Sequence, residues 1–198
     1  MEPLLGIPVG LALSTAAGLR VFVPLLLTGL AARLGYLTLT PSMRWIGSDA
    51  ALVAFATATV LEVAAYYVPW LDNVLDTVAT PAAIGAGVIT TAAVTPELSP
   101  LVRWTLAVLA GGGAAGLVQM TTALLRLKST TFTAGFGNPV VATGELAGSL
   151  ILSALGLLSP LVAAAVVIAL LVFLVRPLLR RSNATQPAAV ARASSAGS

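Results

Sequence analysis

The feature that most constrains this chain is a helix-breaking stretch inside a long apolar run. Residues 134–145 read Ala-Gly-Phe-Gly-Asn-Pro-Val-Val-Ala-Thr-Gly-Glu, with a Gly-Asn-Pro break, a Thr-Gly pair and a carboxylate. Inside a bilayer, backbone groups that such a break frees need partners within the protein or in a water-filled cavity. The stretch is therefore the first candidate for a functional site.

Composition places the chain in the membrane. Apolar residues make up 58% of the 198 residues and charged residues only 9%. A soluble domain of this length needs more charged surface, so we expect an all-α integral membrane protein.

We expect about six transmembrane segments, with segments one and five broken or kinked: 4–32, 50–68, 74–94, 101–125, 130–157 and 159–176. The first exceeds a plain span of about 20 residues. Because Gly18, Arg20 and Pro24 interrupt it, it is either one kinked helix or two half-helices that meet near Gly18, and it either spans or re-enters the membrane.

The polytopic domain is expected to cover residues 1–178, followed by a disordered basic tail over 179–198. The tail region carries Arg176, Arg180, Arg181 and Arg192. Positive residues after the last apolar segment predict a cytoplasmic C-terminus, although six plain spans then leave Arg33 and Arg44 outside.

Residues 17–29 echo the opening stretch. Both carry Ala-Gly and then Pro-x-x-x-Thr-Gly, at Pro24 and at Pro139. One interpretation is an internal repeat, often inverted in transporters, whose broken helices hold substrate near the bilayer midplane. The other is that each motif simply describes a kinked helix in which Thr bonds freed backbone groups.

Four ionisable residues are expected at membrane depth: Arg20, Glu62, Asp76 and Glu145. A charge at the centre of a span costs roughly 2.5–3.5 kcal/mol, so each should face a cavity or a partner. Three acids against one base favour the handling of a cation or proton. Alternatively, an ion pair between Arg20 and Glu145 makes the stretch a structural clasp.

Further polar residues complete the predicted polar path. Asn73, Asp76 and Thr80 share one helix face at i, i+3 and i+7. The alternative is that Asn73 or Asp72 caps this helix and that Asp76, near its start, interacts favourably with the helix dipole. The remaining members are the polar side chains Thr28, Asn138 and Thr143, and carbonyls freed at the helix breaks Gly18, Pro24, Gly137 and Pro139.

Cysteine and histidine are both absent. This removes thiol and imidazole chemistry and the usual zinc, haem and iron–sulfur ligand sets, so we expect no enzyme, cofactor or metal site. The expected partners are the lipid bilayer, a small ion or solute, and a second copy of the chain, but no nucleic acid. Gly112-x-x-x-Gly116 and Gly144-x-x-x-Gly148 predict close helix packing within or between protomers.

Three runs of sequence resemble a bacterial membrane-protein family, domain of unknown function 4126. They are Ala17-Gly-Leu-Arg-Val-Phe-Val-Pro24 with Leu30-Ala-Ala-Arg-Leu-Gly35; Leu61-Glu62 with Pro69-Trp-Leu-Asp-Asn-Val-Leu-Asp76; and Asn138-Pro139. The resemblance implies a small polytopic inner-membrane protein and supplies no substrate. Tyr66-Tyr67 stand where the family commonly has charged residues before the proline of the second run.

The sequence therefore predicts a transporter or channel-like permease for a cation, a proton-coupled solute or a small polar solute. The alternative is a structural or regulatory membrane scaffold or subunit, which would use the same charges for internal pairing and the same glycines for packing.

Overall fold

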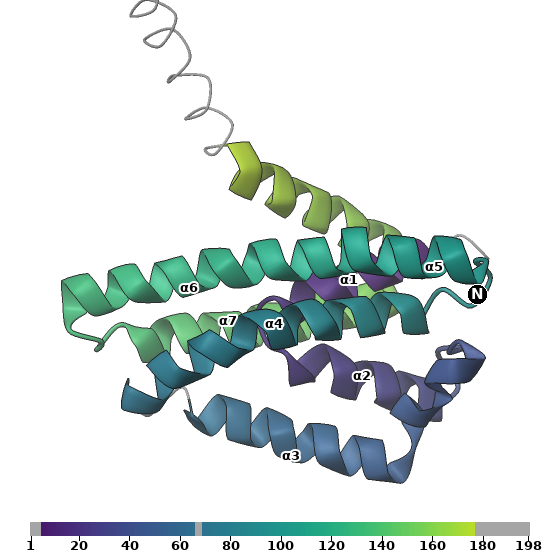
Figure 1. Cartoon of the computed structure of the whole chain (residues 1–198), viewed down its shortest axis with the longest axis horizontal. Helices are drawn as coiled ribbons and strands as arrows, with labels where there is room; N and C mark the ends of the chain where they lie inside the picture. The colour runs from purple at the N-terminus through teal and green to yellow at the C-terminus, as the bar shows by residue number, and fades with distance from the viewer. Residues whose placement is uncertain (1–4, 66–68, 177–198) are drawn as a thin grey trace, which may run out of the picture. The chain divides into compact units, whose positions relative to one another are not determined.

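The computed structural model describes residues 5–65 and 69–176, with side-chain detail lacking for 69–76. Its regular elements are all helices (Figure 1), named here in chain order: α1 (Gly6–Ala17), α2 (Phe22–Arg33), the 3-10 helix η1 (Pro41–Gly47), α3 (Asp49–Ala65), α4 (Pro69–Ala93), α5 (Pro100–Leu106), the π-helix η2 (Ala107–Gly112), α6 (Gly113–Thr133) and α7 (Asn138–Leu158). A further helix covers Pro160–Arg176. The all-α class is confirmed for this part of the chain.

Two of these helices are long and apolar enough to cross a membrane. They are the continuous helix Pro100–Thr133, of 34 residues, and α7, of 21 residues. The pair η1 and α3, bent by 60°, adds a third if it is counted as one span. Where side chains are described, the other apolar helices have 10–17 residues, and α4 counts there only as Thr77–Ala93. The predicted number of six spans therefore stays a prediction.

The first segment forms two half-helices that turn back on each other. α1 ends at Ala17 and α2 begins at Phe22, in agreement with the predicted break near Gly18. A Cβ on Gly6 would collide with the carbonyl of Val94, and after α2 the Thr40 N–H donates to Ala93 O at 2.8 Å. Both open ends therefore lie at the same end of α4, and α1 and α2 form a hairpin (Figure 1).

The length of the hairpin limits how deep it reaches. Each arm has 12 residues, which at 1.5 Å per residue is about 18 Å. A hydrocarbon core is about 30 Å thick, so neither arm is long enough to span it.

The predicted fifth segment has different bounds in the structure. The preceding helix continues to Thr133, and a turn with positive φ at Ala134 (50°) and Gly135 (89°) leads into α7 at Asn138. Pro139 lies in the first helical turn, where its missing N–H leaves no bond unmade. The expected break inside one span at Gly137 and Pro139 is thus a turn between two helices, and α7 itself is unbroken.

The two echoing motifs share local geometry without being inverted. Thr28 Oγ1 donates to Pro24 O at 2.6 Å, and Thr143 Oγ1 donates to Pro139 O at 2.7 Å. α1 is antiparallel to α7, because Ala12 packs near Gly156 while Arg20 reaches Ala142. α2 reverses α1 and therefore runs in the same direction as α7, which does not fit an inverted relation between the motifs.

Glycines allow the helices around the hairpin to approach closely. A Cβ on Gly18 would meet Ala115 O at 2.5 Å, and a Cβ on Gly87 would meet Gly111 O at 2.7 Å. Gly112 and Gly116 face Ile84 of α4, so the predicted close packing occurs here within one protomer. Gly144, in contrast, has open space around its Cβ position.

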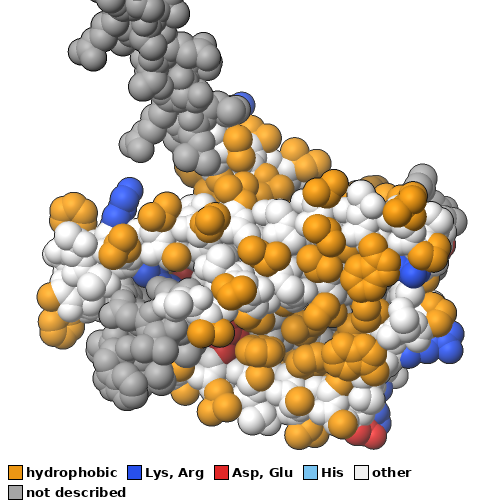
Figure 2. All heavy atoms as spheres, viewed as in Figure 1, with side chains coloured by type: hydrophobic (Ala, Val, Ile, Leu, Met, Phe, Trp, Pro, Cys, Tyr) orange, Lys and Arg blue, Asp and Glu red, His pale blue; other side chains and the backbone are white. Residues whose placement is uncertain are grey.

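The exterior of the described helices is largely apolar. Figure 2 shows hydrophobic side chains spread over the visible face, and exposed ones include Leu109, Phe132 and Leu161. Such continuous apolar surface is rare on a soluble monomer and compatible with a membrane protein.

Candidate functional site

Glu145 of α7 is the centre of a buried ion-pair network. Glu145 is 5% exposed. Arg126 of α6 donates from Nε to Glu145 Oε1 at 3.1 Å and from Nη2 to Oε2, which is a bidentate pairing. Arg20 Nη2 lies 3.5 Å from the same Oε2. One carboxylate thus joins two guanidinium groups from different parts of the chain.

Arg20 comes from the tip of the α1–α2 hairpin. It is 1% exposed and donates from Nη2 to the backbone oxygen of Ala142 at 2.7 Å. The predicted alternative of an ion pair between Arg20 and Glu145 is confirmed by this geometry. The pair fixes the tip of the hairpin against α7.

Glu62 of α3 binds the other side of the hairpin tip. Its Oε1 accepts the Val21 N–H at 2.9 Å, and its Oε2 accepts the Phe22 N–H at 3.2 Å. These are donors at the start of α2, which a helix leaves without an internal partner. A carboxylate there also interacts favourably with the positive end of the helix dipole. Glu62 is therefore the cap of α2.

The second arginine corrects the predicted charge balance. Arg126 directly follows the predicted fourth segment, 101–125, but it is 2% exposed and paired with Glu145. Among the described residues, Glu62 and Glu145 are thus balanced by Arg20 and Arg126. These four residues therefore carry no excess of acid that would favour a cation.

Helix geometry places the network well inside the apolar part of α7. Glu145 lies about 10 Å from the start of α7 at Asn138 and about 20 Å from its end at Leu158, at 1.5 Å per residue. The charges are thus not at the end of the helix, where contact with water would make them inexpensive.

The spacing of polar residues along α6 could have identified Arg126 as a buried residue. Gln119, Thr122 and Arg126 are all buried and follow one another at i, i+3 and i+7 on α6. Their spacing places them on one helix face. Leucines lie on both sides of Arg126 in the sequence, so this arginine does not mark the end of the membrane-spanning segment as the predicted bounds 101–125 assumed.

The facing stripe on α7 continues the polar core. Glu145, Ser149 and Ser153 are buried at i, i+4 and i+8. Ser149 Oγ donates to Ala16 O at 3.0 Å, near the end of α1. Within the described part of the chain, Ser153 Oγ and Gln119 Nε2 are buried without a hydrogen-bond partner. Buried polar atoms of this kind are places where water or a ligand group binds well.

The other predicted path residues take local roles. Thr28 and Thr143 bond carbonyls of their own helices. Asn138 Nδ2 donates to Thr130 Oγ1 at 3.0 Å and so ties the turn between α6 and α7. Thr80 is half-buried on α4 and, among the described side chains, makes no hydrogen bond to the network. The side chains of Asn73 and Asp76 lie outside the described residues.

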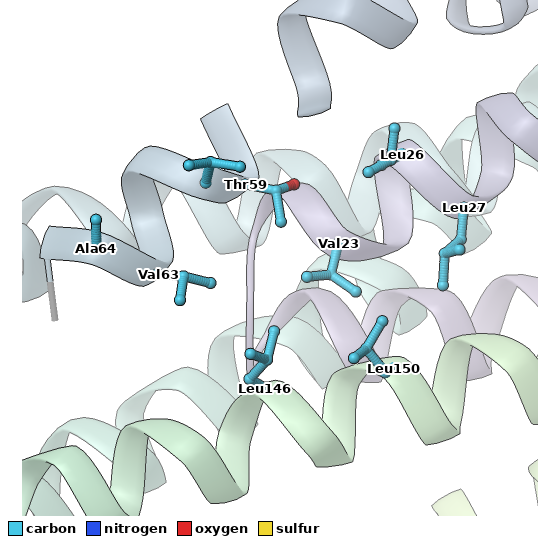
Figure 3. Close-up of a pocket in the computed structure, with 9 residues that line it drawn as sticks. Val23, Leu26, Leu27, Thr59, Val63, Ala64, Leu146 and Leu150 are labelled. Atoms are coloured by element: carbon cyan, nitrogen blue, oxygen red, sulfur yellow. The ribbon is translucent and has the colours of Figure 1, made fainter. Parts of the chain in front are cut away.

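An apolar groove lies between α2, α3 and α7 (Figure 3). It has a volume of about 410 Å³ and is lined from α2, α3 and α7 by Val23, Leu26, Leu27, Thr59, Val60, Val63, Ala64, Leu146 and Leu150. The hydroxyl of Thr59 donates to Phe55 O at 2.8 Å, so the lining offers little to a polar ligand. The groove therefore suits hydrocarbon and is not the predicted polar path.

The described residues contain no group of three or more His, Cys, Asp or Glu side chains placed to hold a metal ion. The arrangement of the site instead resembles a charge clasp. It joins one hairpin tip to three other helices.

Comparison with known proteins identifies the family. The model of the family "Domain of unknown function (DUF4126)" matches residues 7–180, which cover most of the chain. The chain belongs to this family. The Arg20, Glu62, Asn138 and Glu145 positions all lie within the matched region, so they are part of the shared domain. No curated protein and no solved structure matches the chain.

Proposed function

We propose that this protein is a small permease in which the α1–α2 hairpin is a re-entrant element and the Arg20–Glu145–Arg126 network is its closed gate. The observation that carries the proposal is the position of the network. It joins the tip of a hairpin too short to cross the membrane to the two helices that are long enough to do so.

The energetics of buried ions support a functional role. Removing charges from water costs several kcal/mol per ion, and well-packed apolar residues often stabilise a fold equally well. Four buried ionised residues are therefore an expensive way to hold helices together. Ionisable groups inside a membrane commonly mark substrate or ion paths.

The gate works by exchange of partners. In the closed arrangement, Glu145 occupies both guanidinium groups. A polar solute that binds Arg20 or Arg126 competes with Glu145, and protonation of Glu145 releases both. Either event frees the hairpin tip from α7. Because the described charges balance, a small polar or anionic solute is supported as well as a cation or a coupled proton.

The hairpin also modifies the proposed topology. We propose that the apolar segments form five crossing helices and one re-entrant hairpin in the inner membrane. Arg176, Arg180 and Arg181 favour a cytoplasmic C-terminus, and an odd number of crossings then puts the N-terminus on the opposite face.

The test is a flux screen on proteoliposomes at varied pH and with varied cations, anions and polar solutes. Glu145→Gln, Glu62→Gln and Arg20→Lys are compared with Asp49→Asn, which removes a carboxylate of an exposed ion pair outside the network. Circular dichroism and gel filtration establish that each variant is folded. We expect the wild type to show a flux that Asp49→Asn retains. The folded Glu145, Glu62 and Arg20 variants should lose this flux or show it with a changed pH dependence.

The proposal fails if folded Glu145→Gln and Glu62→Gln proteins support every flux of the wild type. It also fails if the wild type transports none of the solutes in a screen of this breadth while the network variants change only stability. That second result would favour a scaffold. A specific observation supports this alternative, because both described buried carboxylates are directly bonded within the protein.

A further inference from the structure

A second pocket, which unlike the apolar groove has two arginines in its lining, lies at the open end of the hairpin, away from the ion-pair network. It has a volume of about 340 Å³, and its lining comes from the end of α2, the connection to η1 and η1 itself. The lining combines two arginines with small and apolar residues around an exposed opening: Ala32, Arg33, Gly35, Leu37, Thr38, Leu39, Arg44 and Gly47.

The backbone around this pocket is well fixed. Gly35 has a φ of 79°, which only glycine adopts without strain, and it reverses the chain after α2. Tyr36 N–H then donates to Ala31 O at 2.9 Å. Thr40 Oγ1 donates to Ala92 O at 2.8 Å, which anchors the connection to the end of α4. The pocket is therefore a preformed feature.

The two arginines in the lining differ in their pairing. Arg33 Nη1 lies 2.5 Å from Asp49 Oδ1, and that pair is well exposed. Arg44 is exposed and has no ion pair with a described carboxylate. The pocket thus offers one uncompensated guanidinium and a second that an exposed carboxylate holds only weakly.

The flanks of the pocket are suited to the membrane–water interface. Tyr36 is 77% exposed, Leu34 61% and Trp45 50%. Trp45 also packs on Phe55, with ring centroids 6.1 Å apart. Exposed aromatic side chains are typical of the interfacial belt, where lipid phosphates lie. Guanidinium pairs recognise phosphate oxygens in a fork geometry.

We propose that this pocket binds the phosphate head group of an anionic phospholipid. The guanidinium groups of Arg33 and Arg44 would hold the phosphate, while Tyr36 and Trp45 lie beside the glycerol region. This site is separate from the proposed gate and does not depend on transport. It would fix the open end of the hairpin at the membrane surface.

The test counts lipids retained by the detergent-purified protein in native mass spectrometry. Phosphatidylglycerol is titrated against zwitterionic phosphatidylcholine. We expect Arg44→Gln to weaken retention of phosphatidylglycerol about fivefold, from about 1 kcal/mol per basic side chain at a membrane surface. Asp49→Asn, which frees Arg33, should strengthen retention.

The matched control is Arg103→Gln, which loses the same charge near the same end of the helices but outside the pocket. Equal losses in Arg44→Gln and Arg103→Gln would overturn the proposal in favour of general charge attraction. Displacement of the lipid by millimolar inorganic phosphate would show a site for a soluble anion instead. Equal retention of phosphatidylcholine would show that charge plays no part.

Discussion

Replacing Glu145 by Gln tests the ion-pair network most directly. The substitution keeps the size and shape of the side chain but removes its charge. Arg20 and Arg126, each no more than 2% exposed, would then lose their shared counter-ion. The question is how much stability this costs the fold.

The magnitude follows from distance and burial. At an effective dielectric constant of about 20, unit charges at the 3.5 Å between Arg20 Nη2 and Glu145 Oε2 attract by about 5 kcal/mol. Much of this offsets desolvation that the fold has already incurred. Removal of one partner from a buried pair commonly costs about 3–5 kcal/mol, because the other charge stays buried. We expect Glu145→Gln to lose that amount.

The assay is reversible unfolding in mixed micelles by titration with sodium dodecyl sulfate, followed by circular dichroism. The matched control is Asp49→Asn, whose exposed pair with Arg33 should contribute less than about 1 kcal/mol. The double variant Arg126→Gln/Glu145→Gln completes a cycle with both single variants. We expect the two single variants to lose more unfolding free energy in sum than the double variant does. The difference should be at least about 1 kcal/mol, as for residues in contact.

Two outcomes would refute this reasoning. One is a loss below about 1 kcal/mol for Glu145→Gln, comparable with the surface pair. The other is strict additivity of Arg126→Gln and Glu145→Gln, since residues that share a charge network must couple.

Three further predictions concern the hairpin. Gly18→Ala should destabilise the fold by about 1–3 kcal/mol because its Cβ would collide with Ala115 O, whereas Gly113→Ala, with open space, should be neutral or slightly stabilising in the same unfolding assay. Since the chain has no cysteine, Leu5→Cys and Tyr36→Cys should react with a membrane-impermeant maleimide from the same side of oriented vesicles, and Phe136→Cys in the turn between α6 and α7 from the other. Labelling of the first two from opposite sides would contradict a re-entrant hairpin. Gly35→Ala should cost about 1 kcal/mol, since its φ of 79° is strained for alanine, while Gly85→Ala serves as the unstrained control.

Helix positions followed from local information in the sequence. Gly18 and the polar Arg20 interrupt an apolar run, and the structure ends α1 at Ala17 and starts α2 at Phe22. The Gly-Asn-Pro run marked a real helix boundary as well. Its assignment to the middle of a span was wrong, because proline fits the first turn of a helix as readily as it breaks one.

The reversal of α1 and α2 could not be read from the sequence. A kinked span and a hairpin contain the same breaker residues, and only long-range contacts separate them. Here those contacts are the packing of Gly6 on Val94 and the bond from Thr40 to Ala93.

The sequence alone determined the apolar character of the helices, the sites where they break and three of the charges that meet at the site, Arg20, Glu62 and Glu145. The tertiary structure decided which partners these charges have. Arg126 meets Glu145 only because α6 continues to Thr133, past the predicted end of the fourth segment, and a short turn then leads into α7, which packs beside α6. Ion pairing depends on distances between segments far apart in the chain, and no local pattern of residues specifies such distances.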